Sequence, residues 1–209
     1  MLSWEDIERN LVNVINNIFS NYEIDELSTY EKRKIIFDFL CNVIKYDYKM
    51  LEGIKNFKIN GVRINRNPIQ ELYSVIYNKK GICNAISQYY KLLLEKVGVK
   101  SYCVICDDGT EINHQLNLVY NCDNDSYSFD DVTSVIVGRG TNMEYFDYDL
   151  EFANSVNQGN KYIMNNQSFV VLPEDYINFL VNRDDSMSEN LEILPYNIIS
   201  SKSKLRSKL

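Results

Sequence analysis

The order of periodic patterns along the chain constrains its fold more than any other feature. From Ala85 to Lys96 apolar residues recur at helical spacing, and Gly98 follows as a helix-ending glycine does. The three segments after it, "SYCVICDD", "INHQLNLVY" and "SYSFDDVTSVIV", are rich in β-branched and aromatic residues and are separated by polar turns. The sequence therefore predicts a helix followed by three antiparallel strands, an α+β arrangement.

Helical spacing recurs elsewhere in the chain. We predict helices at Trp4–Phe19, Thr29 to about Lys45 and Pro173–Val181, and a short helix or turn at Glu71–Tyr77. Ser3 is the expected N-cap of the first of these. Residues 51–70 contain two glycines and a proline, and we expect a loop with short elements there.

The domain organisation is predicted to be simple. With three prolines and eight glycines there is little room for a flexible linker, so residues 1–200 are expected to form one domain. Its parts would be an N-terminal helix at 3–20, a core at about 29–140 and a C-terminal extension at 140–200. Residues 201–209 form a basic tail, predicted to be disordered. The final "SKL" matches a peroxisomal address, but such a triplet arises easily in a tail of this composition.

Charge and cysteine content narrow the classes of partner and compartment. The chain has 22 basic and 29 acidic residues, a net charge of −7, which disfavours nucleic acid or an anionic membrane as partner. No stretch approaches the roughly 18 apolar residues of a membrane span, and the N-terminus has acids where a secretory signal needs a basic start. Five cysteines, an odd number, are expected as reduced thiols. The predicted location is the cytoplasm.

Cys83 lies where a thiol would be activated. It begins the helix that leads to Gly98, and unpaired N–H groups and the helix dipole favour a thiolate there. Lys79 and Lys80 add positive charge nearby in the sequence. A lowered thiol pKa makes the sulfur nucleophilic near neutral pH. The alternative is that Cys83 is a small buried apolar residue, as most free cysteines are.

The other cysteines carry weaker signals. Cys41 lies in the body of an apolar helix and Cys122 in a turn. Cys103 and Cys106 form a C-x-x-C pair, but zinc would require a second ligand pair, and residues three apart on a strand point to opposite faces. We therefore expect neither a metal nor a cofactor.

His114 is the only histidine in the sequence. A cysteine nucleophile needs a base within hydrogen-bond reach, and the base needs an orienting partner. His114 opens the middle strand, and Asp130 and Asp131 lie on the next one. If the hairpin folds about the middle of "NCDNDS", His114 faces Asp131, and a slip by one residue places Asp130 there instead. In either register an acid lies beside the imidazole.

The order of these residues resembles the papain-like arrangement, and more specifically the transglutaminase-like superfamily. That family has a glycine and a cysteine opening a helix, a histidine with an asparagine shortly after it, and an aspartate before a valine and a threonine. Here these are "KKGICNAISQYYKLLLEKVGV", "HQLNLVY" and "SFDDVTS", preceded by "VIKYDY" at the family's entry to the site. The resemblance covers Thr29 to Ser134 and assigns the acid to Asp131. Gln115, Leu116 and Ser134 depart from the family's residues, which affects the expected shape of the substrate grooves.

The resemblance implies a papain-like core, in which the helix bearing Cys83 packs on an antiparallel sheet bearing His114 and Asp131. It implies acyl transfer or hydrolysis on a peptide or glutamine carboxamide through a thioester. The Cys83 N–H is the expected oxyanion donor, with Tyr46 nominated as the second. We favour hydrolysis, as by a cysteine peptidase or amidase.

Two alternatives remain open at this point. The first alternative to a hydrolase is a true glutamine cross-linking or deamidating enzyme. The second is a catalytically silent binding or scaffold module on the same fold. For the enzyme, the expected partner is a protein or peptide substrate. The sequence makes no prediction of the oligomeric state.

Overall fold

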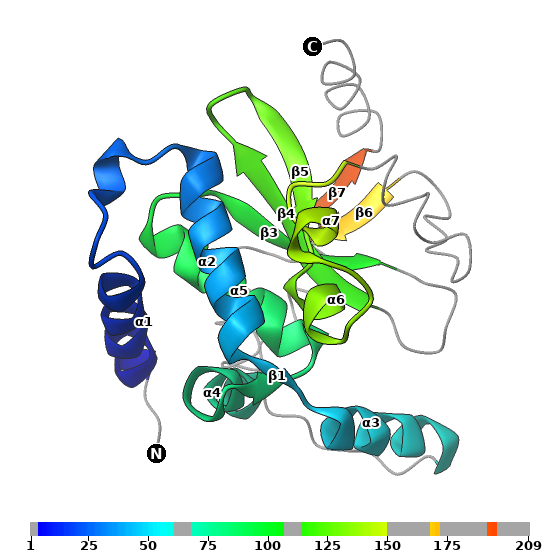
Figure 1. Ribbon diagram of the computed structural model, residues 1–209. Coiled ribbons are helices and arrows are strands. Elements are labelled where there is room, and N and C mark those ends of the chain that lie inside the picture. Colours follow the sequence, from blue (N-terminus) through cyan, green and yellow to red (C-terminus); the bar gives the residue numbers. More distant parts are fainter. Residues whose placement is uncertain (1–3, 61–67, 107–113, 150–167, 172–191, 196–209) are drawn as a thin grey trace.

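The computed structural model describes residues 4–60, 68–106, 114–149, 168–171 and 192–195 (Figure 1). Its helices are α1 (Trp4–Ile18), the 3-10 turn η1 (Ile24–Glu26), α2 (Thr29–Val43), α3 (Tyr48–Asn60), α4 (Pro68–Asn78), α5 (Cys83–Lys96), α6 (Val132–Ile136) and α7 (Asn142–Tyr145). Its strands are β1 (Lys45–Tyr46), β2 (Lys80–Gly81), β3 (Ser101–Cys106), β4 (His114–Asn121), β5 (Ser126–Asp130), β6 (Ser168–Val171) and β7 (Glu192–Pro195). Helices and strands are mixed as the α+β prediction requires.

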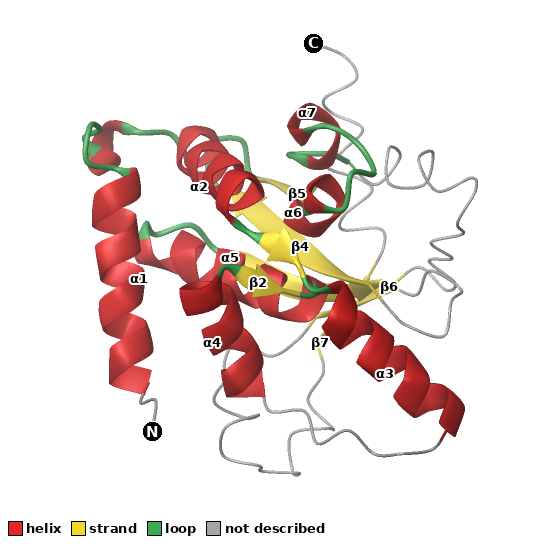
Figure 2. Ribbon diagram, turned by 60° about the horizontal axis from the view of Figure 1, so that its bottom comes forward, coloured by secondary structure: helices red, strands yellow, loops and turns green. Residues whose placement is uncertain are grey.

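The main sheet has the order β5-β4-β3-β6-β7, and every neighbouring pair is antiparallel. The strands β6 and β7, from the predicted C-terminal extension, join the same sheet as the core strands. Helix α5 packs on β3 and β4, while α1, α2 and α4 pack on α5 (Figures 1 and 2). A separate parallel pair joins β1, which follows α2, to β2, which lies directly before α5 in the chain. Helix α3 extends away from this helical layer.

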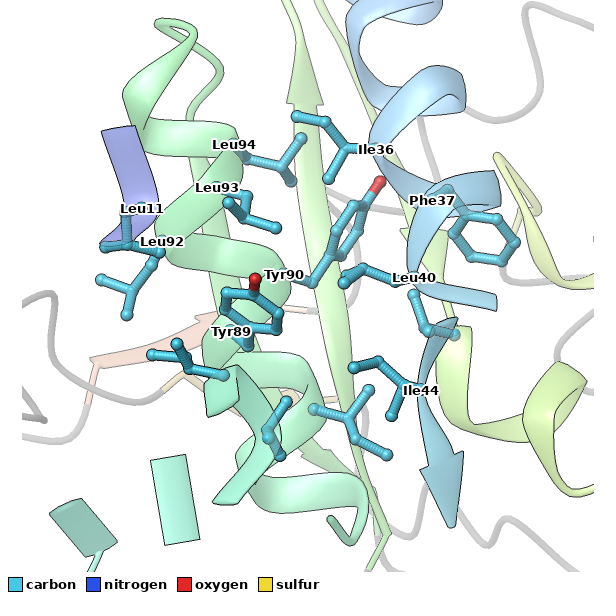
Figure 3. Close-up of a cluster of buried hydrophobic side chains, with 14 of the residues drawn as sticks. Leu11, Ile36, Phe37, Leu40, Ile44, Tyr89, Tyr90, Leu92, Leu93 and Leu94 are labelled. Atoms are coloured by element: carbon cyan, nitrogen blue, oxygen red, sulfur yellow. The ribbon is translucent and has the colours of Figure 1, made fainter. Parts of the chain in front are cut away.

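Helix α5 lies at the centre of the hydrophobic core. Its residues from Ala85 to Leu94 are all buried. In Figure 3, Tyr90 and Leu94 of α5 point toward α2, where Ile36 and Leu40 face them, while Leu92 lies on the other side of α5 near Leu11 of α1. Burying one such aliphatic side chain contributes roughly 1.5–3 kcal/mol, so many contacts fix the axis and rotation of α5. Because α5 is fixed in this way, Cys83 at its first position is also held in place.

Four predicted helices are confirmed within a few residues as α1, α2, α4 and α5. They are the ones expected at Trp4–Phe19, Thr29–Lys45, Glu71–Tyr77 and Ala85–Lys96. Helix α2 begins with a capping box in which Ser28 and Glu31 bond to each other's backbone N–H groups. Ser3, Pro173–Val181 and the tail at 201–209 lie outside the described residues. Within those residues, no helix has the length and apolar character needed to cross a bilayer.

Two expectations about secondary structure are wrong. Residues 51–70 are expected as a loop with short elements, but residues 51–60 belong to the 13-residue helix α3. One glycine costs a helix only about 1 kcal/mol, and the Asp47 carboxylate accepts from the N–H of Met50 in the first turn. The third strand was expected to run through "VTSVI", but it ends at Asp130. Asp131 caps the short helix α6 instead, by accepting from the N–H of Ser134.

Candidate active site

Cys83 is the first residue of α5, and the chain before it is tightly constrained. A Cβ on Gly81 would lie 2.2 Å from Val75 Cγ2, so only glycine fits against α4 at this point. The N–H of Asp47 donates to the Gly81 carbonyl at 2.8 Å, as part of the β1–β2 pairing. The cap residue Ile82 offers no side-chain acceptor to the first turn of α5. The positive end of the helix dipole therefore lies at the half-buried Cys83 thiol.

His114 begins β4, and its ring contacts the acid beyond the end of β5. The ring nitrogen Nε2 donates to Asp131 Oδ2 at 2.8 Å, and both side chains are buried. The expected register, in which His114 lies opposite Asp131 or Asp130, is wrong. The last residue of β5, Asp130, pairs with Asn117 instead. The contact between His114 and Asp131 is made where the chain leaves β5 for α6.

The Asp131 carboxylate is held by more than the histidine. The N–H of Ser134 donates to Oδ1 at 3.0 Å, and the Ser134 hydroxyl donates to Oδ2 at 2.7 Å. The backbone N–H of Asp131 donates to the carbonyl of Tyr145 at 2.9 Å. The acid is thus fixed through its backbone and through both carboxylate oxygens.

The third member of the arrangement is the thiol of Cys83, which is hydrogen-bonded to the imidazole of His114. Because Nε2 is engaged by Asp131, Nδ1 is the ring nitrogen that remains for the sulfur. The backbone N–H of Gln115 also donates to the sulfur. The structure therefore brings Cys83, His114 and Asp131 into one hydrogen-bonded chain.

These contacts favour the charged forms of all three groups. Burial raises the pKa of Cys83, but the hydrogen bond and charge of His114 outweigh it and hold that pKa below its ordinary 9.0. Burial lowers the pKa of His114, but Asp131 and then Cys83 raise it from 6.5 to about 10. Burial raises the pKa of Asp131, and His114 and Ser134 reverse this to leave it lowered. The three contacts therefore favour a thiolate beside an imidazolium over the neutral thiol and imidazole.

The two lysines near Cys83 in the sequence are engaged elsewhere. Lys80 Nζ lies 3.3 Å from Asp47 Oδ1. Lys79 donates to the Ile76 carbonyl. The pKa of the thiol is lowered by His114 and the amide that follows it, which the fold brings in from β4.

Tyr46, the nominated second oxyanion donor, lies beside the site. It pairs with Gly81 in the parallel β1–β2 bridge, and its half-buried ring makes an edge contact with Tyr48 at 5.1 Å between centroids. Burial raises the pKa of its hydroxyl, and the charges of Cys83 and Asp131 raise it further. Its hydroxyl is therefore protonated at neutral pH and within electrostatic range of the thiol.

Asp130, the other candidate acid, has a different partner. The buried guanidinium of Arg33 donates to Oδ1 at 2.8 Å through Nη2 and to Oδ2 at 3.2 Å through Nε. The Tyr90 hydroxyl donates to Oδ2 at 2.8 Å. Arg33 also contacts Ser128 and Asp147. Asp130 belongs to this buried ion network, and the structure places Asp131 alone of the two at the imidazole.

Two of the other cysteines, Cys41 and Cys103, are not activated. Burial raises the pKa of Cys41 and of Cys103 to about 12 in each case. Cys122 is exposed and contacts the Thr29 hydroxyl at 2.9 Å. The side chain of Cys106 is outside the described part of the structure. Among the described residues, no group of three His, Cys, Asp or Glu side chains could hold a metal ion.

Sequence reasoning did not predict the roles of three residues, two of them in the site and one in the neighbouring ion network. Ser134 stands three residues after Asp131, which is the spacing of a helix cap and its partner and could have been noticed. Gln115 ties β4 to α5 through a 2.7 Å hydrogen bond to Ser87, and nothing in the sequence marks it. Arg33 meets its acid 97 residues away, beyond the reach of local patterns.

The fold and the site together define an α+β protein with a buried cysteine–histidine–aspartate chain. No family model and no curated protein matches the sequence. A solved structure described as "Crystal structure of a TGase" matches with a TM-score of 0.49 and 19% identity. The match covers 66% of this chain and 35% of that chain, so the chain corresponds to only part of that protein's length. A likeness of this size assigns neither a family nor an activity.

Proposed function

We propose that this protein is a cysteine-dependent hydrolase or acyltransferase of transglutaminase-like type, with a papain-like core, that acts on a peptide or a glutamine carboxamide. The observation that carries the proposal is the hydrogen-bonded chain from Cys83 through His114 to Asp131, with 2.8 Å between the last two. The lowered pKa of the thiol and the raised pKa of the imidazole support it, since a nucleophile and its proton carrier are then both ready at neutral pH.

In the proposed acylation step, the Cys83 thiolate attacks the carbonyl carbon of the substrate. The His114 imidazolium gives its Nδ1 proton to the leaving ammonia or amine, and a thioester remains on the sulfur. Asp131 keeps the ring oriented and stabilises its charged form, as the acid of a serine triad does. Water or an amine then loses a proton to His114 while attacking the thioester, which restores the thiolate–imidazolium pair.

The negative oxygen formed in each step needs donors. The Cys83 N–H stands at the first position of α5, where the cap supplies no side-chain acceptor and the helix dipole is favourable. Tyr46 is the proposed second donor, since its hydroxyl stays protonated and is electrostatically coupled to Cys83. We expect Tyr46→Phe to lower kcat by about tenfold or more while leaving the alkylation rate of Cys83 within about twofold.

Thiol reactivity tests the central claim. Iodoacetamide alkylation would be followed across pH 5 to 9 for each cysteine by mass spectrometry, in wild type and in His114→Ala. We expect Cys83 alone to react fast at low pH and to lose that advantage without the histidine. Cys41, whose pKa is raised to about 12, is the internal control. If Cys83 titrates like an ordinary thiol in the wild type, the chain is better regarded as a binding or scaffold module on this fold.

Substrate tests separate the possible reactions. Glutamine peptides would be assayed for ammonia release, for incorporation of a fluorescent amine and for backbone cleavage. Cys83→Ala should abolish whichever activity appears, while Cys122→Ala, which removes an exposed thiol away from the site, should keep it. We propose hydrolysis as the main outcome, and predominant amine incorporation would instead identify a cross-linking enzyme.

A further inference from the structure

We infer that Ser134 is a positioning residue of this site, which acts on His114 and Cys83 through Asp131. The inference rests on the proposed function, because it concerns the same thiolate–imidazolium pair. The observation behind it is the buried hydroxyl of Ser134, which is not needed to cap α6.

The geometry separates two roles of Ser134. Its N–H donates to Asp131 Oδ1 at 3.0 Å, which is the bond that caps α6. Its hydroxyl donates at 2.7 Å to the other oxygen, Oδ2, which also accepts from His114 Nε2 at 2.8 Å. Capping the helix needs only the first bond. The second bond stabilises the oxygen that faces the histidine.

Burial makes this second bond consequential. Ser134 is 0% exposed and Asp131 is 2% exposed, so water does not substitute for the hydroxyl. Hydrogen bonds to an ionised acceptor are about twice as strong as neutral ones, and they favour the carboxylate over the acid. With two donors on Oδ2, the carboxylate stays ionised and the Nε2 proton stays on His114. Proton exchange is thereby restricted to Nδ1, on the side of Cys83.

The hydroxyl also restricts the orientation of the acid. Without it, the carboxylate can rotate about the bond to its carbon while Oδ1 keeps the cap. The bond to His114 would then lengthen, the imidazolium would lose stabilisation, and the thiolate would lose its counter-ion. We therefore expect the effect of the hydroxyl to appear at the sulfur of Cys83, which His114 and Asp131 link to Ser134.

The test compares two serine-to-alanine variants. Ser134→Ala removes the hydroxyl beside Asp131. Ser128→Ala removes a hydroxyl that is buried to a similar degree beside the neighbouring ion network, where it donates to Asp147 at 2.6 Å and accepts from Arg33 at 2.9 Å. Ser134→Ala loses one side-chain hydrogen bond to a charged group and Ser128→Ala loses two, so under a purely structural role Ser128→Ala would be at least as disruptive.

Two readouts follow the pair directly. Because His114 is the only histidine, its imidazole gives a single NMR titration, and alkylation by iodoacetamide reports the thiolate at Cys83. In Ser134→Ala we expect the His114 titration to move to lower pH and the alkylation rate at pH 6 to fall by about three- to tenfold. In Ser128→Ala we expect both to match the wild type, with a lower melting temperature only.

The outcomes separate this inference from the proposed function. An unshifted titration in a folded Ser134→Ala protein would overturn the role of Ser134 while leaving the proposed function intact. A wild type without fast alkylation of Cys83 at low pH would overturn the proposed function itself. If Ser134→Ala does not fold, Ser134→Cys keeps nearly the same size with a weaker donor. It should shift the His114 titration in the same direction by less, and no shift would count against the inference.

Discussion

Asp130 and Asp131 are neighbours in the chain and both are buried, yet they belong to different charge pairs. Asp130 ends β5 and pairs with Arg33, and both side chains are 0% exposed. Asp131 caps α6 and pairs with His114. The strand ends between them, so the two carboxylates leave the backbone in different directions.

The partners give the two aspartates different roles. The pKa of Arg33 is raised, with burial opposing the shift and Asp130 producing it, so its charge is permanent under any ordinary condition. That pair ties α2 to β5, and Tyr90 joins α5 to it. The partner of Asp131 is instead an imidazole, which can gain and lose a proton and is bonded to a thiol. Both acids are buried, so burial does not distinguish their roles. The difference is that the partner of Asp131 can gain and lose a proton, whereas the partner of Asp130 cannot.

The largest effect that separates the two pairs is on stability, and we expect it from Asp130→Asn. The substitution preserves size but leaves Arg33 charged and buried, with Asp147, at 3.1 Å, as its remaining acidic partner in the described part of the chain. Removing one partner of a buried ion pair costs about 3–5 kcal/mol, to be measured by urea unfolding. The alkylation profile of Cys83 in the folded protein should be unchanged.

A surface aspartate gives the control for that variant. Asp38 pairs with Lys34 where the two side chains are 37% and 26% exposed, so Asp38→Asn should cost less than about 1 kcal/mol. Equal losses for Asp38→Asn and Asp130→Asn would show that the buried network does not stabilise the fold.

The second effect is on reactivity, and we expect it from Asp131→Asn. An amide keeps the shape but loses the charge that stabilises the imidazolium, and it can select the wrong tautomer of His114. The alkylation rate of Cys83 at pH 6 should fall by about a hundredfold or more, with a smaller loss of stability than in Asp130→Asn. The idea fails if Asp130→Asn, rather than Asp131→Asn, slows the thiol.

The third effect is a change in how stability depends on pH. His114 has a raised pKa, so its contribution is present below 6.5 and lost between 6.5 and about 10. Cys83 has a lowered pKa, so its contribution is present above 9.0 and lost as the pH falls toward its folded value. Between 6.5 and 9.0 the two changes oppose each other, because the folded chain keeps the His114 proton to higher pH and releases the Cys83 proton at lower pH than the unfolded chain does. The pair then adds less slope in that range than His114 alone would.

Cys83→Ser removes one side of this balance. Only the histidine contribution remains, and stability should decline by about 1–2 kcal/mol as the pH rises from 6.5 to 9.0, read by urea unfolding at several pH values. Cys122→Ser changes an exposed thiol and should follow the wild type. Parallel curves for Cys83→Ser and the wild type would mean that the thiol is not ionised at neutral pH. The Arg33–Asp130 pair should give no slope here, since the guanidinium does not titrate.

The parts of this arrangement that were predictable from sequence are those set by local patterns. Apolar spacing gave α5, and the helix start placed Cys83 at its first position. The strand periodicity placed His114 at the start of β4. Both placements depend on the spacing of apolar residues and on helix-end residues such as Gly98. Such signals extend over about fifteen residues of sequence.

The register of β4 and β5 was not predictable in the same way. The turn does not fix it to within two residues, and the observed pairing sets Asn117 against Asp130. The turn argument left Asp130 and Asp131 open, and the family resemblance favoured Asp131, which is the acid hydrogen-bonded to His114 in the structure. Asp130 is engaged instead by Arg33 on α2. Tertiary contacts between residues about a hundred positions apart leave no local pattern to read.

The smallest expected effect is that of Lys80→Ala on Cys83. Proximity in the sequence made this lysine a candidate for lowering the thiol pKa, but its Nζ lies 3.3 Å from Asp47 Oδ1 and its side chain is 42% exposed. An exposed and already paired charge acts weakly through water, so the alkylation rate of Cys83 at pH 6 should stay within about twofold of the wild type. A fall as large as that of Asp131→Asn would mean that sequence neighbours, rather than His114 and Asp131, activate the thiol. We expect no such fall, because the charges that act on Cys83 are the buried ones of His114 on β4 and Asp131 at the start of α6.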